Sequence, residues 1–360
     1  MIVGSWPGRE AGQNRFQRIL LDALEVEGVG VVGFSDSRGI RLEGLDVLIV
    51  HWPERIFQEA GNAAEALRLM TGFLRKLQAR PPSVKVVWVV HNLHPHFVRG
   101  FKRFSWPWYA ARLARAVDGI LTLSKGTVDT VQAGLPGMAG KPFGYFWHPF
   151  YPEEEISPDL RAVERAALGW SDAGTVYGFC GQVRPGKGVE DLVAAFRRLP
   201  DPTVRLLVAG LPLYEHGLAD ALARLAADDP RIRLCLQDLT QEEFRANLGV
   251  CDIVVAPFRR YLHSGSLIHA LSCHRPVLTP ATPFSSSLAD HLTSPDWVQT
   301  YEGPLTPAVL AGARRPRGPI DLAPLAPAEA ARRIIQFLEV LTDREKGDAA
   351  ALPAAAGRSW

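Results

Sequence analysis

The sequence predicts an α/β protein made of two doubly wound domains. Short β-branched runs alternate with longer helical patterns, a segment rich in proline, glycine and aromatic residues interrupts them at 140–158, and the alternation restarts at 175. The runs are continuously apolar, which is typical of parallel strands covered on both faces. A chain of 360 residues can hold two ordinary domains. We expect these at 1–150 and 151–325, as two Rossmann-like domains that face each other across a cleft.

Each element follows from a local pattern of apolar residues. In the first half, strands are expected at 1–4, 29–34, 47–50, 84–90 and 119–124, with helices at 14–27, 57–79 and 106–117. In the second half, strands are expected at 175–180, 204–210, 232–237, 252–258 and 276–280, with helices at 188–199, 217–228, 240–248 and 265–273. A last amphipathic helix at 326–343 precedes a tail, 344–360, that lacks periodicity and is expected to be disordered.

Composition excludes several classes of protein. Hydrophobic residues make up 47% and charged residues 22% of the chain, as in globular proteins, and the formal net charge of +2 gives no global attraction for nucleic acid. The four cysteines show no CxxC spacing, so we expect buried reduced thiols. No signal-peptide pattern and no run of 18 apolar residues occurs. We therefore expect a cytoplasmic protein.

Two loops in the first half follow expected strands, where open α/β sheets bind ligands. In "GSWPGREAGQNRF" (4–16), Gly8 and Gly12 permit close approach of an acceptor and Asn14 can cap the next helix, although an ordinary loop would read the same. In "HWPE" (51–54), Trp52 can stack on an acceptor sugar and Glu54 can accept a proton. Alternatively, Trp52 only fills the end of the strand.

A third loop, "HNLHPH" (91–96), places three histidines after a strand. Histidine suits a general base at neutral pH because its ordinary pKa is about 6.5. Cysteine or carboxylate partners for a metal are missing from the motif, so we expect no metal there. His91 and His94 are therefore candidate bases beside Glu54. The alternative is that the histidines cap backbone groups.

The segment 97–115 mixes aromatic residues with arginine and lysine. Such a segment can lie in the headgroup layer of an anionic membrane, where each cation contributes about 1 kcal/mol. It could also hold single-stranded nucleic acid, or simply form a helix whose aromatic side chains pack inward. We favour contact with the inner face of a membrane and expect no nucleic acid.

In the second half, "GQVRPGKG" (181–188) joins a strand to a helix. It matches neither GxGxxG nor the P-loop, but its glycines, Arg184 and Lys187 suit a phosphate. Fixed cations can stabilise a leaving nucleoside diphosphate without a metal, and the chain contains no DxD pair to chelate one. A solvated surface turn is the alternative.

The stretch 257–280 contains a second anion-binding pattern. Ser264, Gly265 and Ser266 open an apolar helix and offer backbone N–H groups, although Ser264 could be a simple N-cap. Arg259 and Arg260 could add positive charge.

Five further residues are expected to contact the base or sugar of a nucleotide donor. Asp238 and Leu239 follow an expected strand and could meet a nucleobase edge through their backbone. The other three are Gln182, Tyr261 and His263.

The motifs "GFCGQVRPGKGVEDLVAAFRRLP", "VRLLVAG" and "DIVVAPF…SGSLIHALSCHRPVL" resemble the nucleotide-sugar domain of glycosyltransferases with the GT-B fold. The resemblance covers about residues 175–280 and implies that Arg184, Lys187, Ser264, Gly265 and Ser266 bind the donor diphosphate. It also implies that the helix at 326–343 packs back onto the first domain.

One departure concerns the mechanism. Retaining relatives carry two glutamates eight positions apart, where this chain has Tyr261 and His269. An inverting transfer with a base from the first domain is therefore expected. The chain is similar to bacterial glycolipid β-mannosyltransferases of exopolysaccharide assembly, which implies GDP-mannose as donor, a glycan or polyprenyl-linked acceptor and no cofactor. A sugar-nucleotide epimerase or hydrolase, or a non-catalytic nucleotide-sugar-binding protein, are the alternatives.

Overall fold

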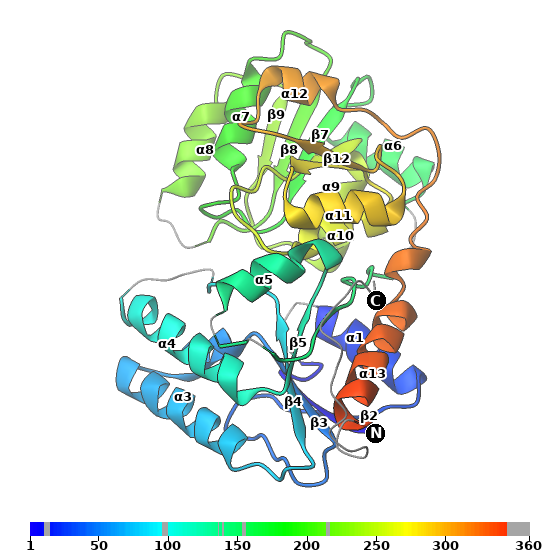
Figure 1. Cartoon of the computed structure of the whole chain (residues 1–360). Helices are drawn as coiled ribbons and strands as arrows, with labels where there is room; N and C mark the ends of the chain where they lie inside the picture. Colours follow the sequence, from blue (N-terminus) through cyan, green and yellow to red (C-terminus); the bar gives the residue numbers. More distant parts are fainter. Residues whose placement is uncertain are drawn as a thin grey trace. The chain divides into compact units, whose positions relative to one another are not determined.

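The computed structural model describes residues 1–10, 15–95, 100–135, 137–138, 140–152, 156–213 and 217–343. It confirms the predicted α/β class: two six-stranded sheets are present in this described part, and every strand pair in them is parallel (Figure 1). The chain divides into two compact units. Unit 1 comprises Met1–Pro149 and the segment from Leu325 onward, and unit 2 comprises Phe150–Pro324. The tail at 344–360 lies outside the described residues.

The sheet of unit 1 has the order β2-β1-β3-β4-β5-β6. Its strands are β1 (Ile2–Trp6), β2 (Gly30–Gly33), β3 (Val47–His51), β4 (Lys85–Val90), β5 (Gly119–Thr122) and β6 (Phe143–Tyr145). The register of β3 on β4 pairs His51 with Val89. This register brings the loop after β3 and the loop after β4 to the same edge of the sheet.

Helices of unit 1 lie on both faces of this sheet (Figure 1). They are α1 (Phe16–Val26), α2 (Ile56–Glu59), α3 (Ala63–Gln78), α4 (Phe101–Ala116), α5 (Val128–Gly134) and α13 (Pro327–Asp343). Helix α13 packs beside α1, and its residues Ala330, Ile334 and Leu338 are buried in one core cluster with β-strand residues. The last helix of the chain thus completes the hydrophobic core of unit 1.

Glycines in β5 and β6 make room for α13. A Cβ atom at Gly144 would lie 2.8 Å from Cδ2 of Phe337, and one at Gly119 would lie 2.9 Å from its Cζ. Because real Cβ atoms do not approach other heavy atoms this closely, larger residues at these positions would push the phenyl ring out of its place.

The sheet of unit 2 has the order β12-β11-β10-β7-β8-β9. Its strands are β7 (Val176–Cys180), β8 (Arg205–Ala209), β9 (Ile232–Cys235), β10 (Ile253–Val255), β11 (Val277–Pro280) and β12 (Val298–Tyr301). Its helices are α6 (Pro158–Ala167), α7 (Val189–Arg197), α8 (Leu218–Ala226), α9 (Gln241–Val250), α10 (Gly265–Ser272), α11 (Pro283–Leu292) and α12 (Pro307–Gly312). The strand order reverses direction between β7 and β10, and ligands of open α/β sheets bind at such a point.

Some elements differ from the prediction. The helix expected at 57–79 is two helices, because Asn62 accepts a hydrogen bond from the amide of Glu65 and caps the second one. Helix α4 begins at Phe101 and tolerates Pro107 inside it. Strand β6 and helix α6 lie in or beside the segment expected to be a connection, and β12 was also missed. These missed elements are short or depend on long-range pairing.

We predict that Ile334→Ala destabilises unit 1 by about 2–5 kcal/mol, because the side chain is fully buried and its removal leaves a cavity. The matched control is Val340→Ala in the same helix, whose side chain is 42% exposed and whose loss should cost no more than about 0.5 kcal/mol. Urea unfolding of the full chain measures both. Equal effects of the two substitutions would contradict the packing of α13 into this core.

Candidate functional site

The loop after β7 contains glycines in backbone conformations that other residues rarely adopt. Gly186 and Gly188 have φ values of +85° and +67°, in the left-handed region. A Cβ atom at Gly188 would lie 2.2 Å from the carbonyl oxygen of Pro257, and one at Gly181 would lie 3.4 Å from Oγ of Ser266. The loop 181–188 therefore packs directly against the segment that follows β10, as expected for two loops that share one site.

Arg184 and Lys187 form the electropositive part of this site. Burial, and then the nearby Arg184, lower the pKa of Lys187 to about 7. The ammonium group lies 3.4 Å from the ring centroid of Phe258, and no ion pair of Lys187 is recorded within the described residues. Two cations are thus held close together in a partly desolvated place. A bound diphosphate would relieve this repulsion and keep Lys187 charged.

Helix α10 contributes its N-terminus to the same place. Ser264 is buried, and its hydroxyl oxygen accepts a hydrogen bond from the amide of Leu267 at 3.4 Å, so the side chain acts as an N-cap. The amides of Gly265 and Ser266 belong to the first turn, whose N–H groups have no partner inside the helix. The loop that carries Arg184 and Lys187 thus lies beside the first turn of α10, where the hydroxyl of Ser264 is already occupied by the cap. The predicted binding of the donor diphosphate by these five residues stays a prediction.

The residues predicted to contact the donor base or sugar lie at the same edge of the sheet. Asp238 is exposed and Leu239 is half-buried, in the loop between β9 and α9. Strand β9 lies two positions from β7, roughly 10 Å at ordinary strand spacing, which fits the length of a nucleoside. Gln182 is exposed beside the phosphate loop.

Tyr261 and His263 are held by neighbours within unit 2. The hydroxyl of Tyr261 lies 3.1 Å from Oγ1 of Thr279 and accepts from Thr282 at 3.3 Å. The ring of His263 packs edge-on against Phe284, with centroids 5.5 Å apart. The predicted contact of these two residues with the donor sugar stays a prediction.

Two other residues of this region have structural partners. Arg259 forms a bidentate ion pair with Asp191, at 2.8 and 2.9 Å, so this carboxylate offsets the positive charge that Arg259 was expected to add. His269 lies between two rings: it stacks on Tyr151 at 4.5 Å and packs on Phe244 at 4.9 Å. The position where retaining relatives carry a glutamate is thus occupied here by an imidazole packed between aromatic rings.

In unit 1, an aromatic cluster lies at the ends of β3 and β4. Nδ1 of His51 and Nε2 of His91 are 2.9 Å apart, and Trp52 stacks on His91 with a centroid distance of 3.9 Å. Phe16, at the start of α1, packs edge-on against His91 at 5.0 Å. Trp52 has a φ of +44°, which turns the chain sharply after β3. His91 is therefore fixed in orientation, with one ring nitrogen committed to His51.

Burial governs the protonation of this cluster. His51 is fully buried, and burial lowers its pKa to about 3, so the ring is neutral at pH 7. Its Nε2 has no hydrogen-bond partner in the described part of the chain. The contact between His51 and His91 was not predicted from the sequence. That bond depends on the register of β3 and β4, which periodicity does not give.

Glu54 places a carboxyl group near the carboxyl ends of β3 and β4. Burial raises its pKa to about 7, against smaller lowering effects of backbone and Asn92 hydrogen bonds and of Arg55. Nδ2 of Asn92 donates to Oε1 of Glu54 at 3.4 Å. Glu54 follows β3 and Asn92 follows β4, so the pair connects the two loops. A carboxyl group with a pKa near 7 is suited to exchange a proton at neutral pH.

The remaining predicted residues of unit 1 lie apart from this pair or outside the described residues. His94 is exposed in the loop after β4. Gly12, Asn14 and His96 fall outside the described residues. Gly8 packs against backbone, because a Cβ there would lie 2.8 Å from Cα of Gly33, so its small size serves the fold and not a ligand.

A residue that the sequence analysis missed is Gln17, in the first turn of α1. It is fully buried, and neither Oε1 nor Nε2 of its amide has a hydrogen-bond partner among the described residues. Buried polar groups in folded proteins normally have partners, so an unpartnered amide beside Phe16 indicates a place where a polar ligand could bind.

Metal-ligating groups do not gather in the structure. Within the described ranges, no three His, Cys, Asp or Glu side chains are placed to hold an ion. The four cysteines carry free thiols, and Cys180, Cys251 and Cys273 are buried, as predicted.

Helix α4 contains residues 101–115 of the basic and aromatic segment and presents them on two faces. Trp106 and Tyr109 are buried, and Nε1 of Trp106 donates to the carbonyl oxygen of Leu93 at 2.9 Å. On the other face, Phe104 is 77% exposed, near the exposed Phe101 and Arg103. Two of the five described aromatic residues of the segment therefore belong to the core, and Phe101 and Phe104 are exposed on a basic and aromatic surface. No described helix is both long enough and apolar enough to cross a bilayer.

Comparison of the sequence with known proteins finds similarity to glycosyltransferases. The family described as "Glycosyl transferases group 1" matches residues 174–294. A GDP-mannose:glycolipid 4-beta-D-mannosyltransferase of Xanthomonas campestris pv. campestris is 28% identical over 291 residues, which cover 79% of this chain and 77% of that protein. A D-inositol 3-phosphate glycosyltransferase of Mycobacterium sp. (strain KMS) is 31% identical over 175 residues, 44% of this chain and 38% of that protein.

Solved structures agree in fold. HepE from Anabaena, in complex with UDP-glucose, superposes with a TM-score of 0.59 at 15% identity and covers 96% of this chain and 99% of its own. WaaG, a glycosyltransferase involved in lipopolysaccharide biosynthesis, gives a TM-score of 0.54 at 17% identity, covering 97% and 100%. The chain thus carries a glycosyl transferases group 1 domain on a GT-B fold, and it is a glycosyltransferase.

Proposed function

We propose that this enzyme transfers mannose from GDP-mannose to a glycan or polyprenyl-linked glycan, with inversion at the anomeric carbon and without a metal. The observation that carries the proposal is the meeting of the Arg184–Lys187 loop with the start of α10, in a chain whose sequence follows that of a GDP-mannose-dependent enzyme over 79% of its length. HepE, which has the same fold, was solved with UDP-glucose, so the base and sugar are inferred from the sequence relative alone.

Unit 2 would bind the donor. As the bond between sugar and diphosphate breaks, negative charge grows on the leaving phosphate oxygens. Arg184, Lys187 and the amides at the start of α10 are fixed before the reaction and can stabilise this charge without reorganising. In other transferases, a metal that bridges the phosphates would supply this stabilisation. Because the protein groups can supply it here, we propose a metal-independent reaction.

Unit 1 would supply the base. Inversion requires a group that removes the proton of the acceptor hydroxyl as that oxygen attacks the sugar. Of the three candidates, Glu54 has a pKa near 7, whereas His91 is committed to His51 and covered by Trp52. His94 is exposed, and no residue of the described part of the chain is seen to orient it. We therefore propose Glu54 as the base, positioned by Asn92, with Trp52 as the platform for the acceptor sugar.

Arg184→Ala and Lys187→Ala should each raise the barrier by about 2–4 kcal/mol, roughly 30- to 1,000-fold in kcat, because each removes a donor that faces the leaving group. Turnover of GDP-mannose with a glycolipid acceptor measures the loss, and EDTA should not change it. Unchanged turnover in both variants would contradict the proposed donor site. Donor consumption that does not require an acceptor would indicate a hydrolase or epimerase.

The pH dependence of GDP binding gives a second check on Lys187. Its pKa in the free protein is about 7, so the ammonium form that attracts a diphosphate is lost as pH rises from 6 to 8. Calorimetry should show GDP affinity falling over this range, with proton uptake on binding near pH 7.5. Lys187→Ala should abolish this dependence and Arg184→Ala should retain it. An identical pH profile in wild type and Lys187→Ala would exclude Lys187 from the site.

Glu54→Gln should lower kcat/KM by about 100-fold or more, because an amide cannot accept the proton. In the wild type, kcat/KM should fall as pH drops below about 7, where Glu54 becomes protonated, and this limb should vanish in the variant. A retained acid limb would point to another base.

The same substitution that lowers activity should raise the stability of the folded protein at high pH. The pKa of Glu54 is about 7 in the folded protein and near the ordinary 4.5 in the unfolded chain, so the folded state loses stability as pH rises from 4.5 through 7. Glu54→Gln removes this loss. Its melting temperature relative to wild type should therefore be higher at pH 8 than at pH 4.5, and a constant difference would contradict the raised pKa.

We further propose that the exposed face of α4 rests on an anionic membrane. Phe104→Ser and Arg103→Gln should each weaken sedimentation with phosphatidylglycerol vesicles about fivefold, and high salt should weaken it for the wild type. Val26→Ser is the control, since Val26 is 84% exposed on α1. If all three variants lose the same amount of vesicle binding, the proposed contact of α4 with the membrane is contradicted.

A further inference from the structure

Unit 2 contains a cavity of about 480 Å³ at the end of its sheet opposite to the predicted donor site. Arg275, which lines the cavity, comes just before β11, and Asp252, which binds two other lining residues, comes just before β10. The donor loops follow the carboxyl ends of β7 and β10. Because all these strands are parallel, the two places are at opposite ends of the sheet.

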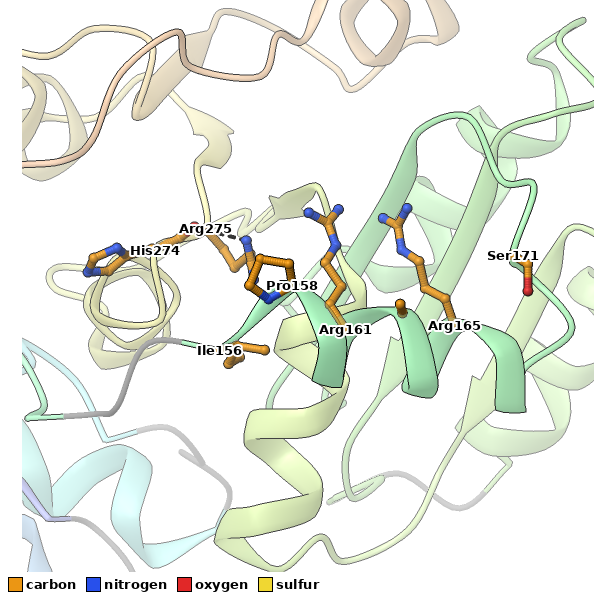
Figure 2. A pocket seen from close by; sticks show the side chains of 8 residues that line it. Ile156, Pro158, Arg161, Arg165, Ser171, His274 and Arg275 are labelled. Atoms are coloured by element: carbon orange, nitrogen blue, oxygen red, sulfur yellow. Dashed lines mark hydrogen bonds between the residues drawn. The ribbon is translucent and has the colours of Figure 1, made fainter.

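The lining combines arginines with apolar surface. Figure 2 shows the guanidinium groups of Arg161 and Arg165 projecting side by side from α6. Arg275 follows α10, and Ile156 with Pro158 forms an apolar wall. Among the described residues that line the cavity, no side chain is acidic. The described lining is therefore positively charged, and the cavity has room for a small molecule.

The carboxylate of Asp252 neutralises only part of the positive charge of these arginines. Its carboxylate accepts hydrogen bonds from Arg161, Arg165, Arg315 and the amide of Val176. Burial alone would raise the pKa of Asp252, but the amide and the arginines outweigh burial and hold it below its ordinary value. One negative charge thus faces three positive charges, and the surplus lies beside the cavity.

Arg275 has no acidic partner in the described part of the chain. Its Nη1 donates to the carbonyl oxygen of His274 at 3.2 Å, and its buried Nε has no hydrogen-bond partner. Nε of Arg161 is likewise buried and unpartnered. Burial, and then the nearby charge of Arg161, lower the pKa of Arg275. A cation without a counter-ion in a desolvated place is unfavourable, so Arg275, with the unpartnered Nε of Arg161 beside it, indicates a place for an anion.

We propose that this cavity is a second anion site, separate from the donor site, which binds the phosphate or diphosphate group of a small molecule. The guanidinium groups of Arg161 and Arg275 hold the oxyanion through charge-assisted hydrogen bonds, and Ser171 offers a hydroxyl. The apolar wall of Ile156 and Pro158 accommodates the rest of the molecule. Arg165 stays bound to Asp252 and contributes its field.

The test is calorimetric titration of the full chain with inorganic pyrophosphate. Two reciprocal variants separate the sites: Arg275→Gln for this cavity, and the double variant Arg184→Ala with Lys187→Ala for the donor site. The double variant should still bind pyrophosphate, with a Kd below about 1 mM, and adding Arg275→Gln to it should weaken that binding at least tenfold. Arg317→Gln, which removes an exposed arginine elsewhere in unit 2, is the charge-matched control and should leave binding unchanged.

Arg275→Gln is the preferred variant because Arg161 and Arg165 are bound to a buried carboxylate and their loss would unfold the unit. If Arg275→Gln does not fold, Ala162→Glu places a negative charge in the cavity from an exposed position of α6 and should have the same effect. The proposal is overturned if the double variant binds no pyrophosphate, or if neither Arg275→Gln nor Ala162→Glu weakens its binding.

Discussion

The proposed donor site depends on contacts between backbone segments that only glycine permits. A Cβ atom at Gly210 would lie 1.9 Å from the carbonyl oxygen of Gly181, and one at Gly188 would lie 2.2 Å from that of Pro257. Through these contacts the loops after β7, β8 and β10 lie against one another. The close packing brings the loop that carries Arg184 and Lys187 beside the start of α10, although the two segments are distant in sequence.

Burial of ionisable groups sets the chemistry available in each unit. Burial shifts the pKa of Lys187 and Glu54 to about 7, where a proton or a ligand changes their charge. Asp252 is also buried, yet it remains ionised because four donors surround it. The pKa of Asp252 behaves differently because of its hydrogen-bond partners and not because of how deeply it is buried. Groups whose pKa burial shifts to about 7 can change charge when a ligand or a proton binds, whereas the fully hydrogen-bonded carboxylate of Asp252 contributes to stability.

Much of the fold could be predicted from sequence because parallel strands buried on both faces leave continuous apolar runs. The ten expected strands all occur, and the loops chosen for chemistry do follow them. Strand β6 and strand β12 were missed, since a three-residue strand and an edge strand leave little periodicity. The helix capped by Asn62 was merged with its neighbour because both share one apolar pattern.

From the sequence, only the loops that follow the strands could be predicted as parts of the candidate site. The bond between His51 and His91 depends on register, and the pairing of Arg259 with Asp191 depends on how two loops meet. Neither is visible in a local pattern. The arginine-lined cavity was not expected at all: Arg161, Asp252 and Arg275 are far apart in sequence and lie at the amino ends of strands, where ligands are not usually sought.

The most direct test of the donor site is a crystal structure of the full chain with GDP-mannose. The expected result is a diphosphate within hydrogen-bonding distance of the side chains of Arg184 and Lys187 and of the amides of Gly265 and Ser266, with the ammonium of Lys187 turned from Phe258 toward the phosphate. A nucleotide bound elsewhere in unit 2, with Lys187 still over the ring of Phe258, would contradict it.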